Sequence, residues 1–515
     1  MSQHPEHYIK LTEMARKASH LHSVAALLGW DQETYMPAGG ANARAEQVAL
    51  MAGLHHEMLT DKRLGDLIGA CAADTSISGG DTQEAANIRE MRKDYNKRTK
   101  LPGELVSALA EATSRAQHAW KDARENGDYG AFKPWLDKVL ELTREKAQCL
   151  SGGKGELYDA LIDDYEPDAK ASEIEAIFTP LKEQISNLVL DIKENGKAPN
   201  REVLNRPIKP AKQEAFGKFV AEACGFDFTR GRLDITTHPF CEGVGPGDTR
   251  MTTRYRESSW TDSLFGIMHE MGHGLYEQGL PLGEPHGQGD LSDQTGLPCG
   301  EAVSLGIHES QSRLWENAVG CSLPFWKWAM PHAKEHLGSV IEDQTPESIV
   351  SAITTAEPSL IRVEADEGTY NLHIMIRFEL ERALLAGDLD TADLPAAWND
   401  AYKTYLGLDV PSDKEGVLQD VHWSFGLIGY FPTYTLGNLY AAQFWAKVHE
   451  EMPDLDDQIA SGEFAPLLTW FRERVHQHGR RYTPAQLCEK ATGEPLSAEP
   501  LVKYLKDKLY PVYGM

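Results

Sequence analysis

The chain has 515 residues, of which 41% are hydrophobic and 25% are charged, and its formal net charge is −27. This composition is typical of a folded globular protein and excludes an intrinsically disordered one. The acidic balance argues against a nucleic-acid partner, because a polyanion is bound by a basic surface.

Cysteine usage and the N-terminal sequence indicate the compartment. The seven cysteines are scattered and contain no Cys-x-x-Cys pair, which favours reduced thiols over a disulfide framework. The N-terminal stretch MSQHPEHYIK lacks the apolar core of a signal peptide. No stretch approaches the about 18 uninterrupted apolar residues that a membrane-spanning helix requires. We therefore expect a cytoplasmic protein with no membrane partner.

The N-terminal part of the chain, up to Gly196, predicts helices almost throughout. Apolar residues recur there at three- and four-residue spacing in stretches rich in Ala, Leu and Met, as in amphipathic helices. Pro102 stands near the start of one predicted helix, and Gly196 follows the lysine-containing last turn of another. The predicted helices lie in residues 11–30, 41–59, 82–100, 101–126, 132–150 and 171–196.

The pattern changes over residues 231–255, GRLDITTHPFCEGVGPGDTRMTTRY. Thr, Ile and Phe cluster and helix formers are few, which predicts two short strands joined by a glycine-rich turn. Helical periodicity resumes at residue 261, with a glycine-rich loop around residues 282–300 and a candidate third strand at 360–366, LIRVEAD. No internal repeat or Pro- and Ser-rich linker interrupts the chain. We therefore predict one domain over residues 1–515, mainly α, with a small β-sheet.

The stretch SLFGIMHEMGHGLYEQGL, residues 263–280, contains two histidines one helical turn apart. Positions i and i+4 of an α-helix differ by about 40° in direction, so His269 and His273 project side by side. Two neutral imidazoles at this spacing can bind one zinc ion, and Glu270 can then take the proton of a metal-bound water that attacks a peptide carbonyl. The alternative is a helix whose two histidines are satisfied by carboxylates or by the backbone.

A catalytic zinc site requires a third protein ligand and an open fourth position. The helical pattern of residues 299–317, CGEAVSLGIHESQSRLWEN, offers Glu301 and Glu309. On a straight helix these two residues are about two turns apart, so only one of them is expected to reach the metal. The spacing alone does not choose between them.

Five motifs in order along the chain resemble those of the carboxypeptidase Taq family of metallocarboxypeptidases. They are the family's DxRxT, HExxH, HESQ, IRxxAD and GxxQDxHW patterns, found here at Asp248–Thr252, His269–His273, His308–Gln311, Ile361–Asp366 and Gly416–Trp423. None of the five departs from the family's pattern, and the resemblance covers most of the chain.

The resemblance implies a ligand set and a fold. In the family, the glutamate of HESQ is the third metal ligand and the glutamate of HExxH is the general base, which are Glu309 and Glu270 here. Family members are mostly helical, similar to neurolysin and angiotensin-converting enzyme, with a long substrate cleft between two helical halves and a small β-sheet next to the zinc site. They are usually homodimers. Zn²⁺ is the expected cofactor, and Co²⁺ or Mn²⁺ can take the same ligands.

A carboxypeptidase must bind the free C-terminal carboxylate of its peptide substrate. A guanidinium does this best, through paired charge-assisted hydrogen bonds. Arg250 and Arg362 are the candidates, and we favour Arg362, with Arg250 either sharing the role or bracing the sheet. The alternative for each is a structural ion pair, for example with Asp248 or Asp366.

The tetrahedral intermediate of peptide hydrolysis needs a hydrogen-bond donor aimed at its oxyanion. Residues 429–438, GYFPTYTLGN, supply Tyr430 and Tyr434 on what the Gly and Pro pattern predicts to be a loop. We predict Tyr434 as the donor, with His422 assisting catalysis or binding substrate and Tyr430 contacting the substrate. The alternative for each of these aromatic residues is core packing.

Together these features predict a zinc-dependent carboxypeptidase that releases single amino acids from peptide C-termini with broad specificity. One alternative is a zinc oligopeptidase or a dipeptidyl carboxypeptidase, which would differ in the length of the released product. Another is a catalytically silent peptide-binding protein, and the presence of all three ligands and of Glu270 argues against it.

Overall fold

The computed structural model describes residues 4–282 and 293–515, so residues 283–292 of the predicted glycine-rich loop lie outside the described part of the chain. The chain divides into two compact units, each built from segments that are distant in sequence. The described residues of Met1–Thr99, Arg201–Val350 and Phe444–Pro495 form the first unit. Lys100–Asn200, Ser351–Gln443 and Leu496–Met515 form the second.

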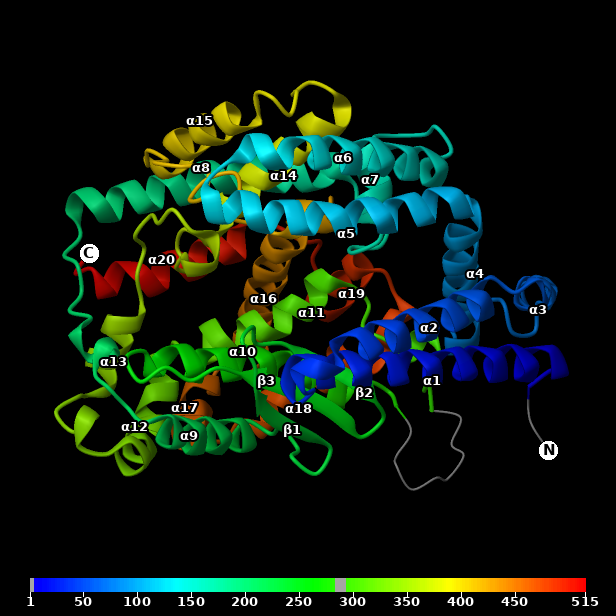
Figure 1. Cartoon of the computed structure of the whole chain (residues 1–515). Coiled ribbons are helices and arrows are strands. Elements are labelled where there is room, and N and C mark those ends of the chain that lie inside the picture. The colour runs from blue at the N-terminus through cyan, green and yellow to red at the C-terminus, as the bar shows by residue number, and fades with distance from the viewer. Residues whose placement is uncertain (1–3, 283–292) are drawn as a thin grey trace. The chain divides into compact units, whose positions relative to one another are not determined.

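The first unit contains helices and a small sheet, labelled in Figure 1. Its strands are β1 (Gly231–Ile235), β2 (Cys241–Gly245) and β3 (Asp248–Thr253). Its α-helices are α1 (Glu6–Thr34), α2 (Ala41–Thr60), α3 (Lys62–Ala73), α4 (Gln83–Lys100), α9 (Pro210–Ala223), α10 (Trp260–Gly279), α11 (Leu305–Arg313), α12 (Leu323–Leu337), α17 (Leu455–Ser461), α18 (Ala465–Arg474) and α19 (Pro484–Thr492). Short helical turns add η1 (Ala38–Gly40), η2 (Glu202–Asn205), η3 (Pro298–Gly300), η4 (Leu314–Val319), η5 (Gly338–Ile341) and η8 (His476–Arg481).

The described residues of the second unit form helices and turns. They are α5 (Gly103–Asn126), α6 (Tyr129–Ser151), α7 (Leu157–Ile162), α8 (Ala171–Asn195), η6 (Arg362–Glu364), α14 (Tyr370–Ala386), α15 (Leu394–Leu406), η7 (His422–Phe425) and α20 (Glu499–Val512). Two further helices, α13 (Pro346–Ile353) and α16 (Pro432–Glu451), run across the boundary between the units in the sequence, and α4 extends one residue beyond the first unit, to Lys100.

The predicted fold class, mainly α with a small sheet, is confirmed. Each predicted N-terminal helix is present, and the predicted ends have visible causes. α5 begins directly after Pro102, and α8 ends at Asn195, where the N–H of Gly196 bonds to Ile192 O at 2.8 Å. Local sequence signals therefore define much of the helical part of the chain.

The number of strands differs from the prediction. Residues 231–255 form three strands in the order β1-β3-β2 rather than two, because a bend at Thr237–His238 and a turn at Pro246–Gly247 divide the segment twice. β1 pairs with β3 in parallel, from Gly231 opposite Thr249 to Ile235 opposite Thr253. β2 pairs with β3 in the antiparallel sense, with a register shift between Gly243 and Gly245.

The candidate strand at residues 360–366 is wrong. The segment contains the single turn η6, in which the N–H groups of Glu364 and Ala365 bond to Ile361 O and Arg362 O at 3.0 and 3.1 Å. The alternation of apolar and charged residues resembles a strand, but Arg362 is buried here as one half of an ion pair rather than exposed. The strand prediction assumed that the charged residues of this segment lie on an exposed face, and the burial of the Arg362 charge contradicts that assumption.

Helix α10 occupies the centre of the first unit and packs on β2, β3, α9, α11 and η4. Two glycines allow this close approach. A Cβ at Gly272 would lie 2.5 Å from Gln311 O and 2.6 Å from Ser312 Cα, and one at Gly274 would lie 2.7 Å from the Phe226 ring. Glycine at position 272 thus lets α11 lie directly on α10.

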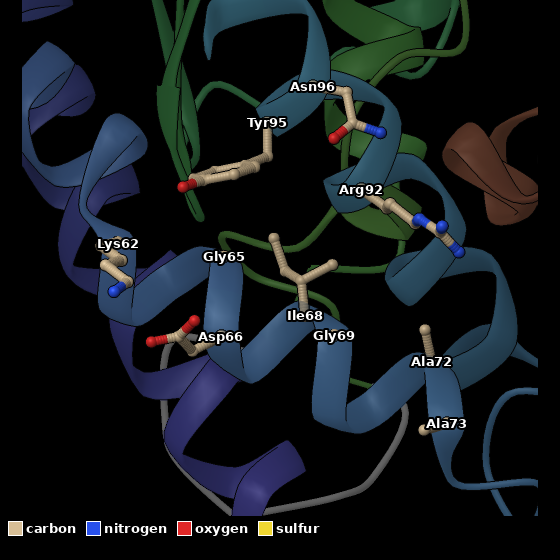
Figure 2. A pocket seen from close by; sticks show the side chains of 10 residues that line it. All are labelled: Lys62, Gly65, Asp66, Ile68, Gly69, Ala72, Ala73, Arg92, Tyr95 and Asn96. Atoms are coloured by element: carbon tan, nitrogen blue, oxygen red, sulfur yellow. The ribbon is translucent and has the colours of Figure 1, made fainter.

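Small residues also shape the contact between α3 and α4. An open groove of about 530 Å³ lies there. Figure 2 shows Gly65, Gly69, Ala72 and Ala73 along one wall of the groove and Tyr95 across from them. A Cβ at Gly65 would lie 2.6 Å from the Tyr95 hydroxyl, so the ring in this position packs directly on the glycine. Among the described helices, none is long and apolar enough to cross a membrane.

Candidate metal centre and substrate residues

His269, His273 and Glu309 come together in the first unit, from α10 and α11. Glu309 Oε2 lies 3.7 Å from His269 Nε2 and 3.5 Å from His273 Nε2. Four ligands at about 2.0–2.2 Å from a tetrahedral zinc ion lie roughly 3.3–3.6 Å from one another. The two imidazoles and the carboxylate therefore have the spacing that one such ion requires.

Hydrogen bonds on the far side of each imidazole support this fit. His269 Nδ1 lies 2.8 Å from Glu316 Oε2, and His273 Nδ1 lies 3.1 Å from the main-chain oxygen of His308. When each Nδ1–H donates to its acceptor, each Nε2 presents a lone pair on the side of Glu309. This pairing of a ring N–H with a carboxylate or a carbonyl is the usual support of a metal-binding histidine.

The charges around the two imidazoles favour one bound cation. Burial lowers the pKa of His269, but Glu309, Glu316 and Glu270 outweigh burial and raise it to about 9. Burial instead lowers the pKa of the adjacent His273 well below its ordinary value. The directions differ because carboxylates surround His269, whereas the imidazoles of His308 and His269 and the guanidinium of Arg313 lie near His273.

Glu270 follows His269 on α10 and is 6% exposed. Burial, together with the neighbouring carboxylates Glu309 and Glu316, raises the pKa of Glu270 to about 7, although His269 opposes this rise. A carboxyl group with a pKa near neutral pH can accept a proton in one step and return it in the next.

The structure separates the two candidates for the third ligand. α11 begins at Leu305, so the single helix predicted over residues 299–317 is wrong in its first part. Glu301 lies before α11, is largely exposed, and pairs with Arg480 at 2.9 Å. Of the two glutamates, Glu309 lies beside the histidines.

Arg250 lies on β3 in the first unit and pairs with Asp248. Its Nε and a terminal nitrogen donate to the two carboxylate oxygens, both at 2.8 Å. The guanidinium carbon is 4.2 Å from the centre of the Trp30 ring. These contacts match the structural ion pair that we considered for Arg250, and they attach α1 to the sheet.

Arg362 is buried in the second unit and forms an ion pair with Asp420, whereas the alternative of a structural ion pair named Asp366 as an example. Its Nε donates to Asp420 Oδ1 at 2.9 Å and a terminal nitrogen donates to the Tyr370 hydroxyl at 3.0 Å. Arg377 donates to the other oxygen of Asp420 at 2.7 Å. Although burial opposes them, the two guanidiniums hold the pKa of Asp420 well below its ordinary value.

Tyr434, His422 and Tyr430 also lie in the second unit. Tyr434 is in the first turn of α16 and not on a loop, because Pro432 begins that helix. The Tyr434 ring centre is 5.2 Å from the guanidinium carbon of Arg362, and its hydroxyl is 3.4 Å from His422 Nε2. Burial lowers the pKa of His422 to about 4, so its ring is neutral at neutral pH. The Tyr430 ring packs edge-on against Tyr434, with centres 5.4 Å apart.

Three charged residues at these clusters were missed from the sequence. Arg313 and Glu316 contact the metal-ligand candidates, and Arg377 contacts Asp420. Arg313 and Glu316 stand four and seven positions after Glu309, so the helical period could have placed them on the same face. Arg377 belongs to none of the five motifs, and the sequence carries no signal for its contact.

A helix with His-Glu-x-x-His, packed beside a second helix that carries a carboxylate, is typical of HExxH metallopeptidases. The mainly helical fold and the cluster of His269, His273 and Glu309 therefore define a metallopeptidase. Comparison with known proteins gives the family.

The chain belongs to the carboxypeptidase Taq (M32) metallopeptidase family, whose model matches residues 10–509. It is 45% identical to thermostable carboxypeptidase 1 of Thermus thermophilus over 515 residues, which cover 98% of this chain and 99% of that protein. It is 35% identical to carboxypeptidase 1 of Bacillus subtilis, over 97% of each chain. Among solved structures, the M32 carboxypeptidase of Deinococcus radiodurans R1 is similar with a TM-score of 0.94 and 40% identity, over 99% of this chain and 100% of that one.

These relationships confirm the predicted family and enzyme class. The protein is a metallocarboxypeptidase, a hydrolase that acts on peptides and depends on a divalent metal ion.

Proposed function

We propose that this metallocarboxypeptidase uses zinc and releases single amino acids in succession from peptide C-termini, with broad specificity. The observation that carries the proposal is the approach of Glu309 Oε2 to the Nε2 atoms of His269 and His273, at 3.7 and 3.5 Å. Two imidazoles and a carboxylate at this spacing suit Zn²⁺, with Co²⁺ or Mn²⁺ as substitutes. When bound, the metal would polarise the scissile carbonyl and acidify the attacking water.

Glu270 is the proposed general base. It takes a proton from the water that attacks the last peptide carbonyl, and then passes that proton to the nitrogen of the leaving amino acid. The buried position of Glu270 beside His269 and the rise of its pKa to about 7 support this role.

Arg362 is the proposed ligand of the substrate's terminal carboxylate. Arg362 and Arg377 carry two positive charges against the single negative charge of Asp420, and this excess suits an anion. Asp420 and Tyr370 fix the orientation of the guanidinium of Arg362. We give Arg250 the bracing role, because it pairs with Asp248 inside the sheet and packs on the Trp30 ring of α1.

Tyr434 is the proposed donor to the oxyanion, with His422 as its neighbour and Tyr430 as a substrate contact. The short distance between Tyr434 and Arg362 supports a shared role for these two residues. His422 is neutral at neutral pH, so it can donate or accept a hydrogen bond without adding charge.

Product analysis tests the reaction type. A peptide with a free C-terminus and the same peptide with a C-terminal amide are incubated with the enzyme, and the products are followed by mass spectrometry. We expect a ladder of products that shorten by one residue at a time, and a much slower reaction of the amide. Release of dipeptides would instead identify a dipeptidyl carboxypeptidase, and internal fragments from both peptides would identify an oligopeptidase.

Three further expectations concern the whole protein. The family resemblance supports a homodimer, which sedimentation of the purified protein tests by mass. The scattered cysteines support a cytoplasmic location, and fractionation of the source cells tests it. We also keep the interpretation that residues 1–515 act as a single catalytic domain.

A further inference from the structure

We propose that Arg313 is a positioning residue of the metal centre. In this proposal its guanidinium holds one oxygen of Glu309 away from the metal and, through Glu316, fixes the ring of His269. The inference rests on the proposed ligand roles of His269 and Glu309, and it adds a single side chain that supports ligands on two different helices.

The two oxygens of Glu309 have different partners. Oε1 accepts a hydrogen bond from Arg313 Nε at 3.0 Å. Oε2 faces the Nε2 atoms of His269 and His273 at 3.7 and 3.5 Å and also accepts a hydrogen bond from Ser312 Oγ at 3.0 Å. Arg313 holds Oε1, and Oε2 is the oxygen that faces the two Nε2 atoms, so Oε2 is the one placed to bind the metal.

Arg313 also reaches the outer partner of His269. A terminal nitrogen of Arg313 donates to Glu316 Oε2 at 3.3 Å, and this same oxygen lies 2.8 Å from His269 Nδ1. One guanidinium therefore connects the carboxylate ligand on α11 with the imidazole ligand on α10. A lysine has a single ammonium group in place of a planar fork and cannot reproduce both contacts with the same geometry.

The surroundings keep these contacts in place. The side chains of Glu309, Arg313 and Glu316 are 10%, 17% and 20% exposed. Arg313 is the last residue of α11, and the π-helical turn η4 that carries Glu316 begins at the next residue. Such turns occur frequently at functional sites. The absence of a side chain at Gly272 allows α11 to lie against α10 at this point.

The contact between Arg313 and Glu309 Oε1 affects how many positions on the metal the Glu309 carboxylate would occupy. A carboxylate that binds through both oxygens takes two positions on the metal, whereas a carboxylate that binds through one oxygen leaves a position for water. By holding Glu309 Oε1, Arg313 favours three protein ligands and an open fourth position. Loss of supporting hydrogen bonds around metal ligands typically weakens metal binding by about 10–100-fold.

Zinc affinity measured by competition with a chromogenic chelator tests the proposal without reference to turnover. Arg313→Met should weaken zinc binding by about 10–100-fold, and Arg313→Lys should recover only part of it. Arg115→Met is the matched control, because Arg115 forms an exposed pair with Glu111 at the same four-residue spacing and its loss should leave the affinity unchanged. An Arg313→Met protein with wild-type zinc affinity would overturn the proposal.

A second variant covers the case in which Arg313→Met does not fold. Glu316→Gln preserves the side-chain shape but weakens the link to both Arg313 and His269, so it should also reduce zinc affinity. In the double variant Arg313→Met, Glu316→Gln the two losses should be less than additive, because both act on the same contact. Fully additive losses would contradict the connection through Arg313.

The spectrum of the Co²⁺-substituted protein reports the coordination number. Wild-type protein should give the intense visible bands of four-coordinate Co²⁺, and Arg313→Met should give the weaker bands of a higher coordination number. Identical spectra would contradict the one-oxygen role. If Glu309→Gln retains wild-type zinc affinity, the proposed metal centre itself is wrong, and this result differs from a failure confined to the Arg313 variants.

Discussion

The two units bury charge of opposite sign around their candidate functional residues. In the first unit, the carboxylates of Glu270, Glu309 and Glu316 surround His269 and are opposed by the guanidinium of Arg313. In the second unit, two guanidiniums meet the one carboxylate of Asp420. Buried charge of one sign is costly unless it is compensated.

The difference explains what each cluster can bind. Excess negative charge beside two imidazoles favours a cation, and excess positive charge beside aromatic rings favours an anion. A metallocarboxypeptidase needs both functions, because its metal ion is a cation and the C-terminus of its substrate is an anion. The pattern of charge therefore supports separate roles for the two clusters.

The largest expected effect follows from changing the first cluster at Glu270. Glu270→Gln should reduce kcat by about 10²–10⁴-fold, because the amide cannot accept the proton of the attacking water. Zinc content should remain at the wild-type level, since Glu270 is not among the proposed ligands. Steady-state hydrolysis of a blocked dipeptide and metal analysis of the same sample measure the two quantities.

Glu57→Gln is the control for Glu270→Gln. It changes an exposed glutamate on α2 and should leave both kcat and zinc content unchanged. Normal turnover in Glu270→Gln would exclude Glu270 as the base.

The second cluster is tested by Arg362→Lys. This change keeps the charge but loses the paired geometry, so kcat/KM for peptides with a free C-terminus should fall by about 10–100-fold, as expected for a hydrogen bond between charged groups worth about 1.5–3 kcal/mol. The residual rate on the C-terminal amide should change little. Arg382→Lys is the control, because Arg382 on α14 forms a partly exposed pair with Glu156. Equal losses on both peptides would show that Arg362 does not bind the terminal carboxylate.

Gly272→Ala tests the packing of the first cluster and leaves its charge unchanged. The new methyl group in Gly272→Ala would lie 2.5 Å from Gln311 O, so the helices must separate and the free energy of unfolding should fall by about 1–3 kcal/mol. Gly53→Ala on α2 is the matched control, because a Cβ at Gly53 meets no neighbour within 4 Å and alanine favours helix. Urea unfolding of both variants measures the difference. Wild-type stability in Gly272→Ala would contradict the close packing of α10 on α11.

The smallest effect concerns Asp366, a motif residue that lies outside the Arg362 ion pair. Burial raises the pKa of Asp366 to about 6, so the folded protein holds this proton more tightly than the unfolded chain does. The stabilisation of the folded protein by this proton is complete at pH values below the ordinary pKa of an aspartate, and it is lost as the pH rises through about 6. Unfolding free energy should therefore fall by about 1–2 kcal/mol more in wild type than in Asp366→Asn between about pH 4.5 and pH 7.5. Parallel pH profiles of the two proteins would show that Asp366 is ionised throughout.

Much of the fold and part of the site could be predicted from the sequence. Helix ends follow from local signals such as Pro102 and Gly196, and the i, i+4 spacing places His269 and His273 on one face without any tertiary information. The spacing of Glu301 and Glu309 does not choose between them, so the choice of Glu309 required the family resemblance. In the structure, α11 begins only at Leu305 and therefore does not contain Glu301.

Other features depend on contacts between distant segments. The burial of Arg362 against Asp420 converts a strand-like pattern into a turn, and no local signal reports that partner. The Gly and Pro pattern predicts a loop at Tyr434, but Pro432 begins α16, and a proline in the first turn of a helix is compatible with the helix. Arg377 joins Asp420 across 43 residues of sequence.

Removal and return of the metal tests the central claim most directly. The purified enzyme is stripped with a chelator, titrated with zinc, and assayed by mass spectrometry for release of C-terminal residues. We predict no release from the stripped enzyme, and full recovery of one-residue steps when one zinc ion per chain has been added. Release that persists in metal-free enzyme, or recovery that yields only dipeptides or internal fragments, would contradict the account.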